Sequence, residues 1–272
     1  MNAVMGSERI AVEAQSLQVT YNRLAIAIDG VSISVPEGAI VAVLGANGAG
    51  KTTTLRALTG FLPSENASLT AGTVTLHGEI QNGRLPHQVA RDGMMLVPER
   101  HKIFATLTVD ENLAAVPTRK GGNREQMKAL VFEVFPALEA LRPRHGGLLS
   151  GGERQMLAVA KALIADPTVL LVDELSLGLA PAVVTRMMDA LRRIRSLKSL
   201  SLVIVEQNAV AALQVADYAY IMRTGRVVLS GPSADLLGDR EVQRVYLGLS
   251  EAGSTTSYRR LGARRVRGSD DD

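Results

Sequence analysis

The chain has 272 residues, of which 46% are hydrophobic and 21% charged, and this composition excludes a disordered chain. The 30 lysines and arginines exceed the 27 aspartates and glutamates by only +3, too little to indicate a nucleic-acid or membrane-surface partner. The absence of cysteine excludes disulfides, zinc ribbons and thiol nucleophiles. No apolar run approaches the roughly 18–20 residues of a membrane span, and residues 1–12 lack the apolar region of a signal peptide. We therefore expect a soluble, cytoplasmic protein.

Short apolar runs and helical patterns alternate along the first half of the chain. The run at 38–44 follows the turn signal Pro36-Glu37-Gly38 and is typical of a strand buried on both faces. Next come a helical pattern at 52–59 and expected strands at 72–80, of which 72–76 is the core, and at 93–97. From 108 to 141 the pattern is helical; it opens with the capping box Thr108-Val-Asp-Glu111 and is broken at 121–123.

The second half of the chain returns to strands. A helix is expected from about 151 to 165, where Asp166-Pro167 stops it. We then expect strands at 168–172, 202–205, 218–222 and 226–229, with a helix at about 181–196. This alternation predicts an α/β sheet into which the helical stretch 108–165 is inserted. Residues 250–272 carry five arginines but no periodicity and are expected to form a disordered Arg-rich tail.

A phosphate-binding loop is the first motif that carries chemistry. Residues 45–52, GANGAGKT, fit the pattern GxxxxGK[ST] and stand between an expected strand and an expected helix. Glycines let successive N–H groups face a phosphate, and the helix N-terminus adds partial positive charge. Lys51 should reach the β- and γ-phosphates, and the Thr52 hydroxyl should bind Mg2+. The nucleotide-binding candidates here are Gly45, Asn47, Gly48, Gly50, Lys51, Thr52 and Thr53.

An acidic pair ends the strand expected around residue 170. Asp173 and Glu174 follow Val169-Leu-Leu-Val172, and alone such a pair is most often a strand-end turn. With a phosphate loop upstream, we predict instead that Asp173 holds Mg2+ through its waters and that Glu174 polarises an attacking water.

The most diagnostic stretch is Leu149-Ser-Gly-Gly-Glu153. Ser150 and Glu153 form a capping box, so one interpretation is simply a well-capped helix. Gly151 and Gly152, however, expose backbone N–H groups at a helix N-terminus, which is an anion site. Because the chain already has a complete phosphate loop, the economical interpretation is that this segment binds the γ-phosphate held by a second subunit.

These motifs, in this order and together with Ser176-Leu-Gly-Leu179, resemble the ATP-binding subunit of ATP-binding-cassette (ABC) transporters. The resemblance covers about residues 10–249. It implies a P-loop NTPase fold of the α/β class, with an ABC nucleotide-binding domain at 9–249 and a helical subdomain inserted at about 100–160. By the same resemblance, Tyr21 matches the aromatic residue that stacks on adenine, although alone it would more often be a strand residue. Residues 176–179 match the D-loop that crosses the dimer interface.

Two positions depart from the common ABC pattern. Glu99, in Val-Pro-Glu-Arg, stands where most members have a Gln that senses Mg2+ and couples to the membrane subunit. Gln207, in Val-Glu-Gln-Asn, stands where most have a His. Both departures resemble the ATPases of branched-chain amino-acid importers, most closely the second of their ATPase subunits, as do the segments 108–113 and 246–248. Gln207 has hydrogen-bond donors but cannot titrate, so we expect this side chain to give hydrolysis little pH dependence near neutrality. The alternative is that Gln207 marks a weak site and that a sister subunit carries the better one.

The resemblance implies an ATPase, with ATP and Mg2+ bound, that energises a membrane importer of branched-chain or related hydrophobic amino acids. Its expected partners are a second ABC ATPase subunit, or a second copy of itself, in a head-to-tail dimer, two permease subunits and, indirectly, a substrate-binding protein, with no nucleic acid. The expected location is peripheral, on the cytoplasmic face of the inner (cytoplasmic) membrane. Alternatives are a urea or short-amide importer of the same branch and a soluble ABC ATPase without a transport role. A small-molecule P-loop kinase leaves Leu149–Glu153 unexplained.

Several other residues receive plainer interpretations. The four histidines, His77, His87, His101 and His145, lack metal-ligand spacing and are expected on the surface. The basic residues of the helix at 181–196 and just beyond it are expected to form a solvated face. Phe104 has two equally weighted interpretations, as a contact to a membrane subunit or as part of the helical core.

Overall fold

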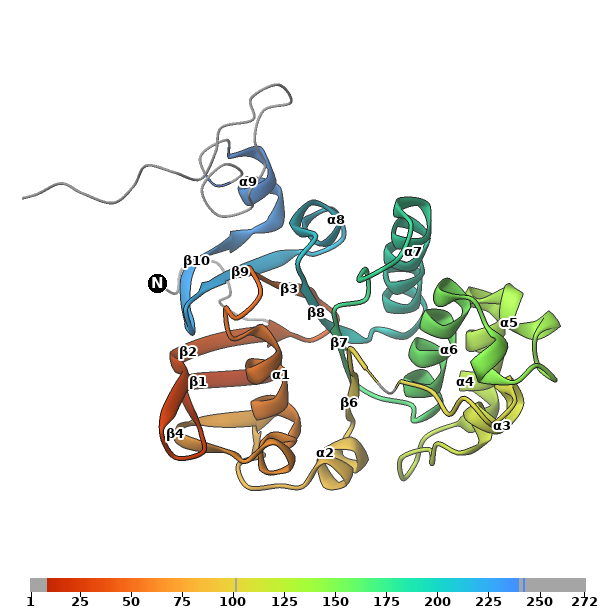
Figure 1. The fold of residues 1–272 in the computed structure, drawn as a ribbon, viewed down its shortest axis with the longest axis horizontal. Helices are drawn as coiled ribbons and strands as arrows, with labels where there is room; N and C mark the ends of the chain where they lie inside the picture. The colour runs from red at the N-terminus through yellow and green to blue at the C-terminus, as the bar shows by residue number, and fades with distance from the viewer. Residues whose placement is uncertain (1–8, 101, 240–241, 243–272) are drawn as a thin grey trace, which may run out of the picture.

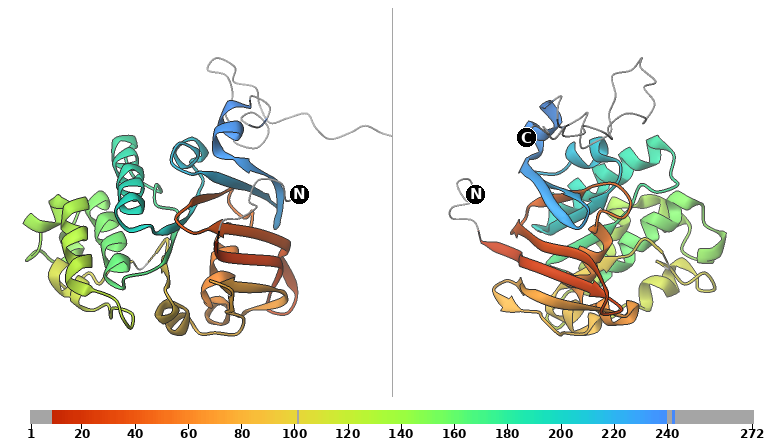
Figure 2. Two further views of the ribbon diagram at one scale, coloured as in Figure 1. Left: turned by 180° about the vertical axis from the view of Figure 1, so that it is seen from behind. Right: turned by 60° about the vertical axis from the view of Figure 1, so that its left-hand side comes forward.

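The computed structural model describes residues 9–100, 102–239 and 242. The expected tail at 250–272, the segment 246–248 and His101 lie outside the described residues. Two β-sheets pack against each other through a shared apolar cluster, and a group of helices extends from one edge of the larger sheet (Figure 1). The view from behind shows the same arrangement, with the smaller sheet and the helical group at opposite ends (Figure 2).

The larger sheet has six strands in the order β10-β9-β3-β8-β7-β6. Neighbouring strands run parallel except β10, which pairs with β9 as an antiparallel hairpin at one edge. The sheet consists of β3 (Ile40–Leu44), β6 (Met94–Val97), β7 (Val169–Asp173), β8 (Ser201–Glu206), β9 (Tyr218–Arg223) and β10 (Arg226–Pro232). Every residue of β3, β7 and β8 is buried, as their unbroken apolar runs predict for a sheet covered on both faces.

The smaller sheet has four antiparallel strands in the order β2-β1-β4-β5. They are β1 (Ile10–Tyr21), β2 (Ala25–Pro36), β4 (Ala67–Leu76) and β5 (Glu79–Ile80). The single strand expected at 72–80 is therefore wrong: His77 and Gly78 adopt positive φ values of 49° and 85° and turn the chain between β4 and β5. The long strands β1 and β2 were not predicted, because register shifts such as the one between Ala14 and Leu17 interrupt the alternation that would mark a strand.

The helices are mostly where the sequence places them. The helical stretch expected from 108 to 141 is divided into separate helices, and the short α2, α8 and α9 were not expected. The bounds are α1 (Lys51–Thr59), α2 (Pro86–Asp92), α3 (Val109–Ala114), α4 (Arg124–Val134), α5 (Pro136–Ala140), α6 (Gly151–Ile164), α7 (Pro181–Lys198), α8 (Ala209–Leu213) and α9 (Ser233–Gly238), with 3-10 turns at Leu62–Glu65 and Gly146–Leu148. No helix among the residues described is long and apolar enough to cross a membrane.

Separate apolar clusters cover the phosphate-loop strand. Ile40 belongs to the cluster that the sheet forms with helices α3 to α7, whereas Val41 and Val43 point into the cluster shared with the smaller sheet and α1. Ala42 and Leu44 pack with α8 and α9. Because packing on all sides fixes β3, the loop that follows it has a rigid base.

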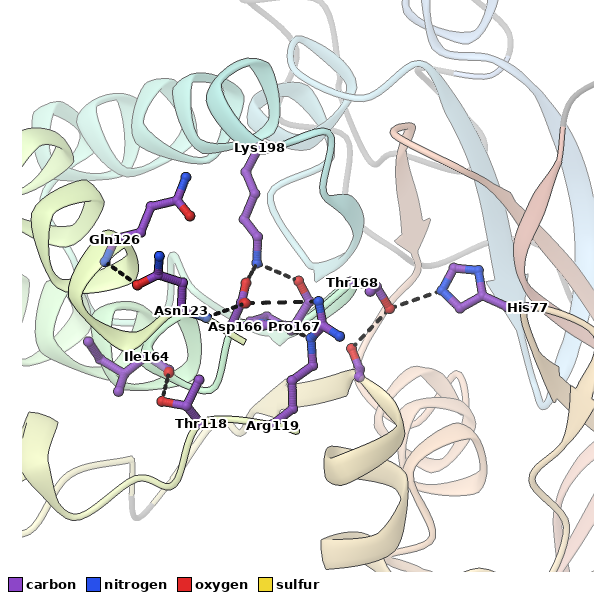
Figure 3. Close-up of polar contacts among 11 residues, drawn as sticks. His77, Thr118, Arg119, Asn123, Gln126, Ile164, Asp166, Pro167, Thr168 and Lys198 are labelled. Carbon is purple, nitrogen blue, oxygen red and sulfur yellow. Dashed lines mark hydrogen bonds and ion pairs between the residues drawn. The ribbon is translucent and has the colours of Figure 1, made fainter. Parts of the chain in front are cut away.

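A polar network around Asp166 joins the helical group to α7 (Figure 3). The Asp166 side chain is buried, pairs with the Lys198 ammonium and accepts a hydrogen bond of 3.1 Å from the Asn123 N–H. Arg119 donates to the Asp166 carbonyl, and Lys198 also donates to the Pro167 carbonyl at 2.8 Å. The network thus ties the loop between α3 and α4 to the C-terminal end of α7.

The described histidines lie on the surface as expected. His77, His87 and His145 are all exposed. His77 contacts Glu37 at 3.1 Å and the Thr168 hydroxyl at 2.9 Å. It therefore joins the end of β4 in the smaller sheet to the residue that precedes β7 (Figure 3).

Replacement of Asp166 tests how strongly this network holds the fold. Burial raises the pKa of Asp166, but hydrogen bonds from Lys198 and Asn123 outweigh burial and leave the pKa below its ordinary value. A depressed carboxyl pKa stabilises the fold above the unfolded-state pKa of about 3.9, and this stabilisation is lost as the pH falls through the folded-state pKa. We expect Asp166→Asn to lower the free energy of unfolding at pH 7 by about 1–3 kcal/mol in urea titrations. The difference from the unmodified protein should shrink as the pH falls below about 4.

The matched control is Asp189→Asn, which removes the exposed ion pair with Arg192 on α7 and should change stability little. Equal effects of the two substitutions, or a difference that persists at low pH, would contradict the role given to Asp166.

Candidate active site

The phosphate loop needs glycine at two of its positions. Gly45 follows β3 with a φ of +155°, and a Cβ there would lie 2.4 Å from the Met222 carbonyl oxygen. Gly50 has a φ of +102°, and its Cβ would lie 2.7 Å from Ile28 Cγ2. The Met222 carbonyl of β9 and the Ile28 side chain of β2 therefore lie directly against these two positions, and with their positive φ values both positions favour glycine. Helix α1 begins at the next residue, Lys51.

Lys51 places its ammonium group at the centre of this loop. Its side chain is buried, and Nζ donates to the Gly45 carbonyl at 2.9 Å and to the Ala46 carbonyl at 3.3 Å. The same Nζ lies 3.4 Å from Glu174 Oε1. The Lys51 ammonium group therefore contacts both the loop that follows β3 and the acidic pair at the end of β7, through Glu174.

The acidic pair stands at the end of β7, against the loop. Thr52 donates to Asp173 Oδ1 at 3.2 Å, and Asp173 is buried. Burial, reinforced by the charges of Glu174 and Glu99 and opposed by the Thr52 hydrogen bond and Lys51, raises the pKa of Asp173 to about 6. Glu174 has a left-handed φ of 46°, and its N–H donates to the Val205 carbonyl at 2.9 Å. The chain therefore turns sharply just where Glu174 faces Lys51.

One open cavity of about 680 Å³ collects half of the predicted site residues. This volume suits a nucleotide-sized ligand. The sequence-predicted residues on its wall are Asn47, Gly48, Gly50, Lys51, Thr52, Thr53, Glu99 and Glu174. The lining residues that the sequence did not predict are Ile26, Ala27, Arg100, Leu177, Thr224 and Gly225.

The donor groups at this cavity fit Mg2+ only together with a phosphate-bearing ligand. Thr52 and Asp173 offer a hydroxyl and a carboxylate side by side, and oxygen donors are what this ion prefers. Across residues 9–100, 102–239 and 242, no group of three or more His, Cys, Asp or Glu side chains could hold a metal ion. Mg2+ in such sites takes one or two protein ligands and completes its coordination with phosphates and waters. Thr52 and Asp173 can therefore supply the ligands that come from the protein. The pair is not a preassembled metal centre.

The two departures from the common ABC pattern occupy different walls. Glu99 lines the 680 Å³ cavity, and its Oε1 accepts a hydrogen bond from Arg100 Nε at 3.2 Å. Gln207 is exposed and lines a neighbouring cavity of about 330 Å³ together with Glu174 and Glu206. Glu174 therefore stands between the two cavities, within reach of groups from both.

The Leu149–Glu153 stretch does not line the 680 Å³ cavity. The expected capping box is present: Glu153 N–H donates to Ser150 Oγ at 3.4 Å, and Ser150 N–H donates to Glu153 Oε2 at 2.7 Å. The bond from Ser150 lowers the pKa of Glu153. Ser150 and Gly151 are exposed, whereas Gly152 is half-buried against Val183. The N-terminus of α6 thus faces solvent, apart from the chain's own phosphate loop.

Tyr21 lies beside the phosphate-loop helix rather than on the cavity wall. Its hydroxyl is 3.3 Å from Thr53 Oγ1 and accepts a hydrogen bond from Arg56 at 3.4 Å. Its ring packs partly into the cluster of the smaller sheet. Stacking of Tyr21 on adenine therefore stays a prediction.

The β9–β10 turn supports the loop and was missed by sequence reasoning. The Gly225 N–H donates to the Ala49 carbonyl at 3.0 Å, and its carbonyl accepts from Asp29 N–H at 2.9 Å. A Cβ at Gly225 would lie 2.5 Å from the Ala27 carbonyl oxygen. Thr224-Gly225 between two expected strands does indicate a tight turn, but nothing in the sequence places that turn against the phosphate loop.

Known proteins resemble this chain along most of its length. Residues 28–176 match the family model described as ABC transporter. The chain is 38% identical over 231 residues to the high-affinity branched-chain amino acid transport ATP-binding protein BraG of Pseudomonas aeruginosa, covering 84% of this chain and 96% of that protein. It is 35% identical over 235 residues to the probable branched-chain amino acid transport ATP-binding protein LivF of Archaeoglobus fulgidus, covering 86% and 97%. Among solved structures, the ADP conformation of an ATP-binding cassette of an ABC transporter covers 88% of this chain and 99% of that chain, with a TM-score of 0.73 and 24% identity.

Substitution of Gly225 tests whether the β9–β10 turn shapes the phosphate loop. We expect Gly225→Ala to weaken ATP binding by at least about tenfold. The added methyl group would clash with the Ala27 carbonyl and displace the turn, whose Gly225 N–H holds the Ala49 carbonyl. The control is Gly83→Ala, whose φ of +73° matches the +74° of Gly225 but whose Cβ would meet nothing within 4 Å. Isothermal titration calorimetry with ATP and Mg2+ measures both affinities. Equal affinities for the two variants would show that the turn does not matter for the loop.

Proposed function

The chain belongs to the ABC transporter family, and on that basis we propose that it is the ATP-hydrolysing subunit of a membrane importer of branched-chain amino acids. The observation that carries the chemistry is the meeting of Lys51, Thr52 and the Asp173-Glu174 pair at one cavity. The names of two relatives, each over 30% identical along most of the chain, support the transported substrate. In this proposal residues 9–249 are the nucleotide-binding domain, with its helical subdomain at about 100–160.

The phosphate loop is proposed to hold the triphosphate of ATP. Backbone N–H groups of residues 45–52 cradle the phosphates, and Lys51 exchanges its carbonyl contacts for phosphate oxygens. Tyr21 is proposed to contact the adenine from the side of Thr53. Thr52 and Asp173 would hold Mg2+, which when bound supplies positive charge that balances the phosphates.

Glu174 is proposed to act on the attacking water. Its carboxylate already lies 3.4 Å from Lys51 Nζ, so it faces the position that the γ-phosphate takes in the loop. There it orients a water and accepts its proton as the water oxygen attacks the γ-phosphorus and the bond between this phosphorus and the bridging oxygen breaks, releasing ADP. Gln207, on the wall of the neighbouring cavity, is proposed to donate a hydrogen bond to the phosphate. Glu99, which lines the 680 Å³ cavity, is proposed to sense Mg2+ and to couple the site to the membrane subunit.

A second chain is proposed to complete the site. Ser150, Gly151 and Gly152 open α6 but do not line the chain's own 680 Å³ cavity, while Glu153 caps the same helix. In a head-to-tail dimer, with a second copy or a related ATPase, this helix N-terminus would meet the γ-phosphate held by the partner's loop. ATP then closes the dimer, and hydrolysis reopens it.

The segment after Glu99 is proposed to contact the permease. Phe104 is 52% exposed rather than part of the helical core, and Lys161 Nζ lies 4.1 Å from its ring centroid. Its backbone is fixed by Asn112, which bonds both the Phe104 N–H and its carbonyl at 2.8 and 2.9 Å. A rigidly held, exposed aromatic residue that follows Glu99 closely in the chain can pass a shift of the nucleotide site to a membrane subunit. Two permeases, with an external binding protein, would place the chain at the cytoplasmic face of the membrane.

Glu174→Gln separates binding from hydrolysis. We expect this variant to bind ATP normally but to lower kcat by at least about 100-fold, because the amide cannot accept the proton of the water. Without turnover, the ATP-bound dimer should persist and be visible by size-exclusion chromatography with ATP and Mg2+. Lys51→Ala serves as the contrasting variant and should lose ATP binding as well as turnover. Normal turnover in Glu174→Gln would remove this residue as the base.

Partners and substrate are tested in the native organism. The tagged chain, purified in mild detergent from native membranes, should carry multi-span permeases and an ATPase subunit, identified by mass spectrometry. Deletion of its gene should reduce uptake of radiolabelled leucine, isoleucine and valine, and Lys51→Ala should not restore it. Unchanged uptake of these amino acids together with reduced urea uptake would reassign the substrate within the same family. Recovery with ribosomal or DNA-bound proteins would overturn the transport proposal.

A further inference from the structure

The mechanism proposed above leaves one buried carboxylate without a role. Glu206 ends β8 and is 1% exposed. It accepts a hydrogen bond of 2.9 Å from the Ser176 N–H and a second from the Ser176 hydroxyl. A buried carboxylate costs free energy unless its oxygens are satisfied, and here Ser176 bonds both of them while the Leu175 backbone adds a further hydrogen bond. The buried Glu206 carboxylate therefore holds the segment that begins with Leu175 and Ser176.

That segment lies directly downstream of Glu174. After β7 the chain turns at Glu174, where φ is 46°, and the Glu174 N–H bonds the Val205 carbonyl at 2.9 Å. Ser176 then bonds Glu206. The last two residues of β8 therefore hold the chain on both sides of Glu174, and the Glu206 carboxylate supplies the downstream half of this support.

The segment that Ser176 begins forms a wall of three cavities. Leu177 lines the 680 Å³ cavity, the 330 Å³ cavity beside Gln207 and a third cavity of about 350 Å³ between Glu99 and Gly151. Leu177 is 57% exposed, so it has little packing of its own to fix it. Its position depends on Ser176 and hence on Glu206.

We propose that Glu206 is a positioning residue for hydrolysis: it holds Ser176 and, through the backbone, sets the direction of the Glu174 carboxylate and of residues 177–179. The inference rests on the proposed ATP hydrolysis. Glu206 itself touches no ATP. A displacement of about 1 Å of a catalytic group can lower a rate by about 100-fold, so a residue of this kind acts on kcat. Glu206 pairs with Leu44, the residue before the phosphate loop, through the strand backbone. A side-chain substitution leaves this pairing in place, so we expect the affinity for ATP to be kept.

The experiment measures steady-state ATP hydrolysis of the full-length chain. Glu206→Ala removes both acceptors and should lower kcat by about 10- to 100-fold while the KM for ATP stays within about threefold. Glu206→Gln keeps one acceptor oxygen for the Ser176 N–H and should restore kcat to within about threefold of the unmodified protein. Ser176→Ala loses only the hydroxyl bond and should show an intermediate loss. The double variant should be no slower than Glu206→Ala alone, because both act through one contact.

A structural control comes from the other end of the same strand. Ser201 begins β8, is buried, and accepts a hydrogen bond from the Gly38 N–H at 2.9 Å, far from the cavity walls. Ser201→Ala should lower the thermal unfolding temperature, as Glu206→Ala does, yet leave kcat unchanged. The proportion of chains that bind ATP, measured by calorimetry, shows that each variant is folded.

The outcomes separate this inference from the proposed function. If the unmodified protein hydrolyses ATP and Glu174→Gln does not, while Glu206→Ala keeps normal kcat, the positioning role fails and the proposed function stands. If Glu206→Ala raises KM as much as it lowers kcat, or Glu206→Gln gives no recovery, Glu206 is merely structural and the inference is overturned. Absence of hydrolysis in the unmodified protein instead defeats the proposed function.

Discussion

The site depends on the register of three adjacent parallel strands, β3, β8 and β7. Val43 pairs with Val205, and Val205 pairs with Asp173, so the carboxyl ends of these strands lie in one row. That row brings the phosphate loop after β3 and the acidic pair of β7 together, although they are distant in the chain. The close approach of Lys51 to Glu174 follows from it. A shift of one residue in either pairing would turn Asp173 to the other face of the sheet and separate these groups.

Negative charge is concentrated at the carboxyl ends of these strands, and this favours the binding of a cation. Asp173, Glu174, Glu99 and Glu206 all act electrostatically on Lys102, whose pKa burial lowers and these acids raise. The Asp173 pKa is raised by burial and by its acidic neighbours together. An ATP molecule adds further negative charge, so we infer that binding of the nucleotide and of Mg2+ to this pocket are strongly coupled. Burial and the charge of Glu174 also raise the pKa of Glu206, and the hydrogen bonds from Ser176 oppose this effect.

Local signals in the sequence predicted the core of the site, and distant contacts account for what they missed. The phosphate loop, the acidic pair and the Ser150–Glu153 capping box each lie within a few consecutive residues, so their patterns are readable directly. Gly225 supports the loop only because β9 pairs with β3, and a linear pattern does not state that pairing. The smaller sheet was predicted only in part because its strands carry bulges and a turn at His77-Gly78. The sequence also does not show whether Phe104 is buried or exposed, because the exposure of an aromatic residue after a loop depends on its neighbours in the fold.

The central claim is that one chain holds the triphosphate while the other completes the site, and the structure of Glu174→Gln with ATP and Mg2+ tests it most directly. The account predicts two chains around two ATP molecules, with each γ-phosphate between Lys51 of one chain and Ser150–Gly152 of the other. A structure in which each triphosphate contacts a single chain, with the N-terminus of α6 open to solvent, would contradict it.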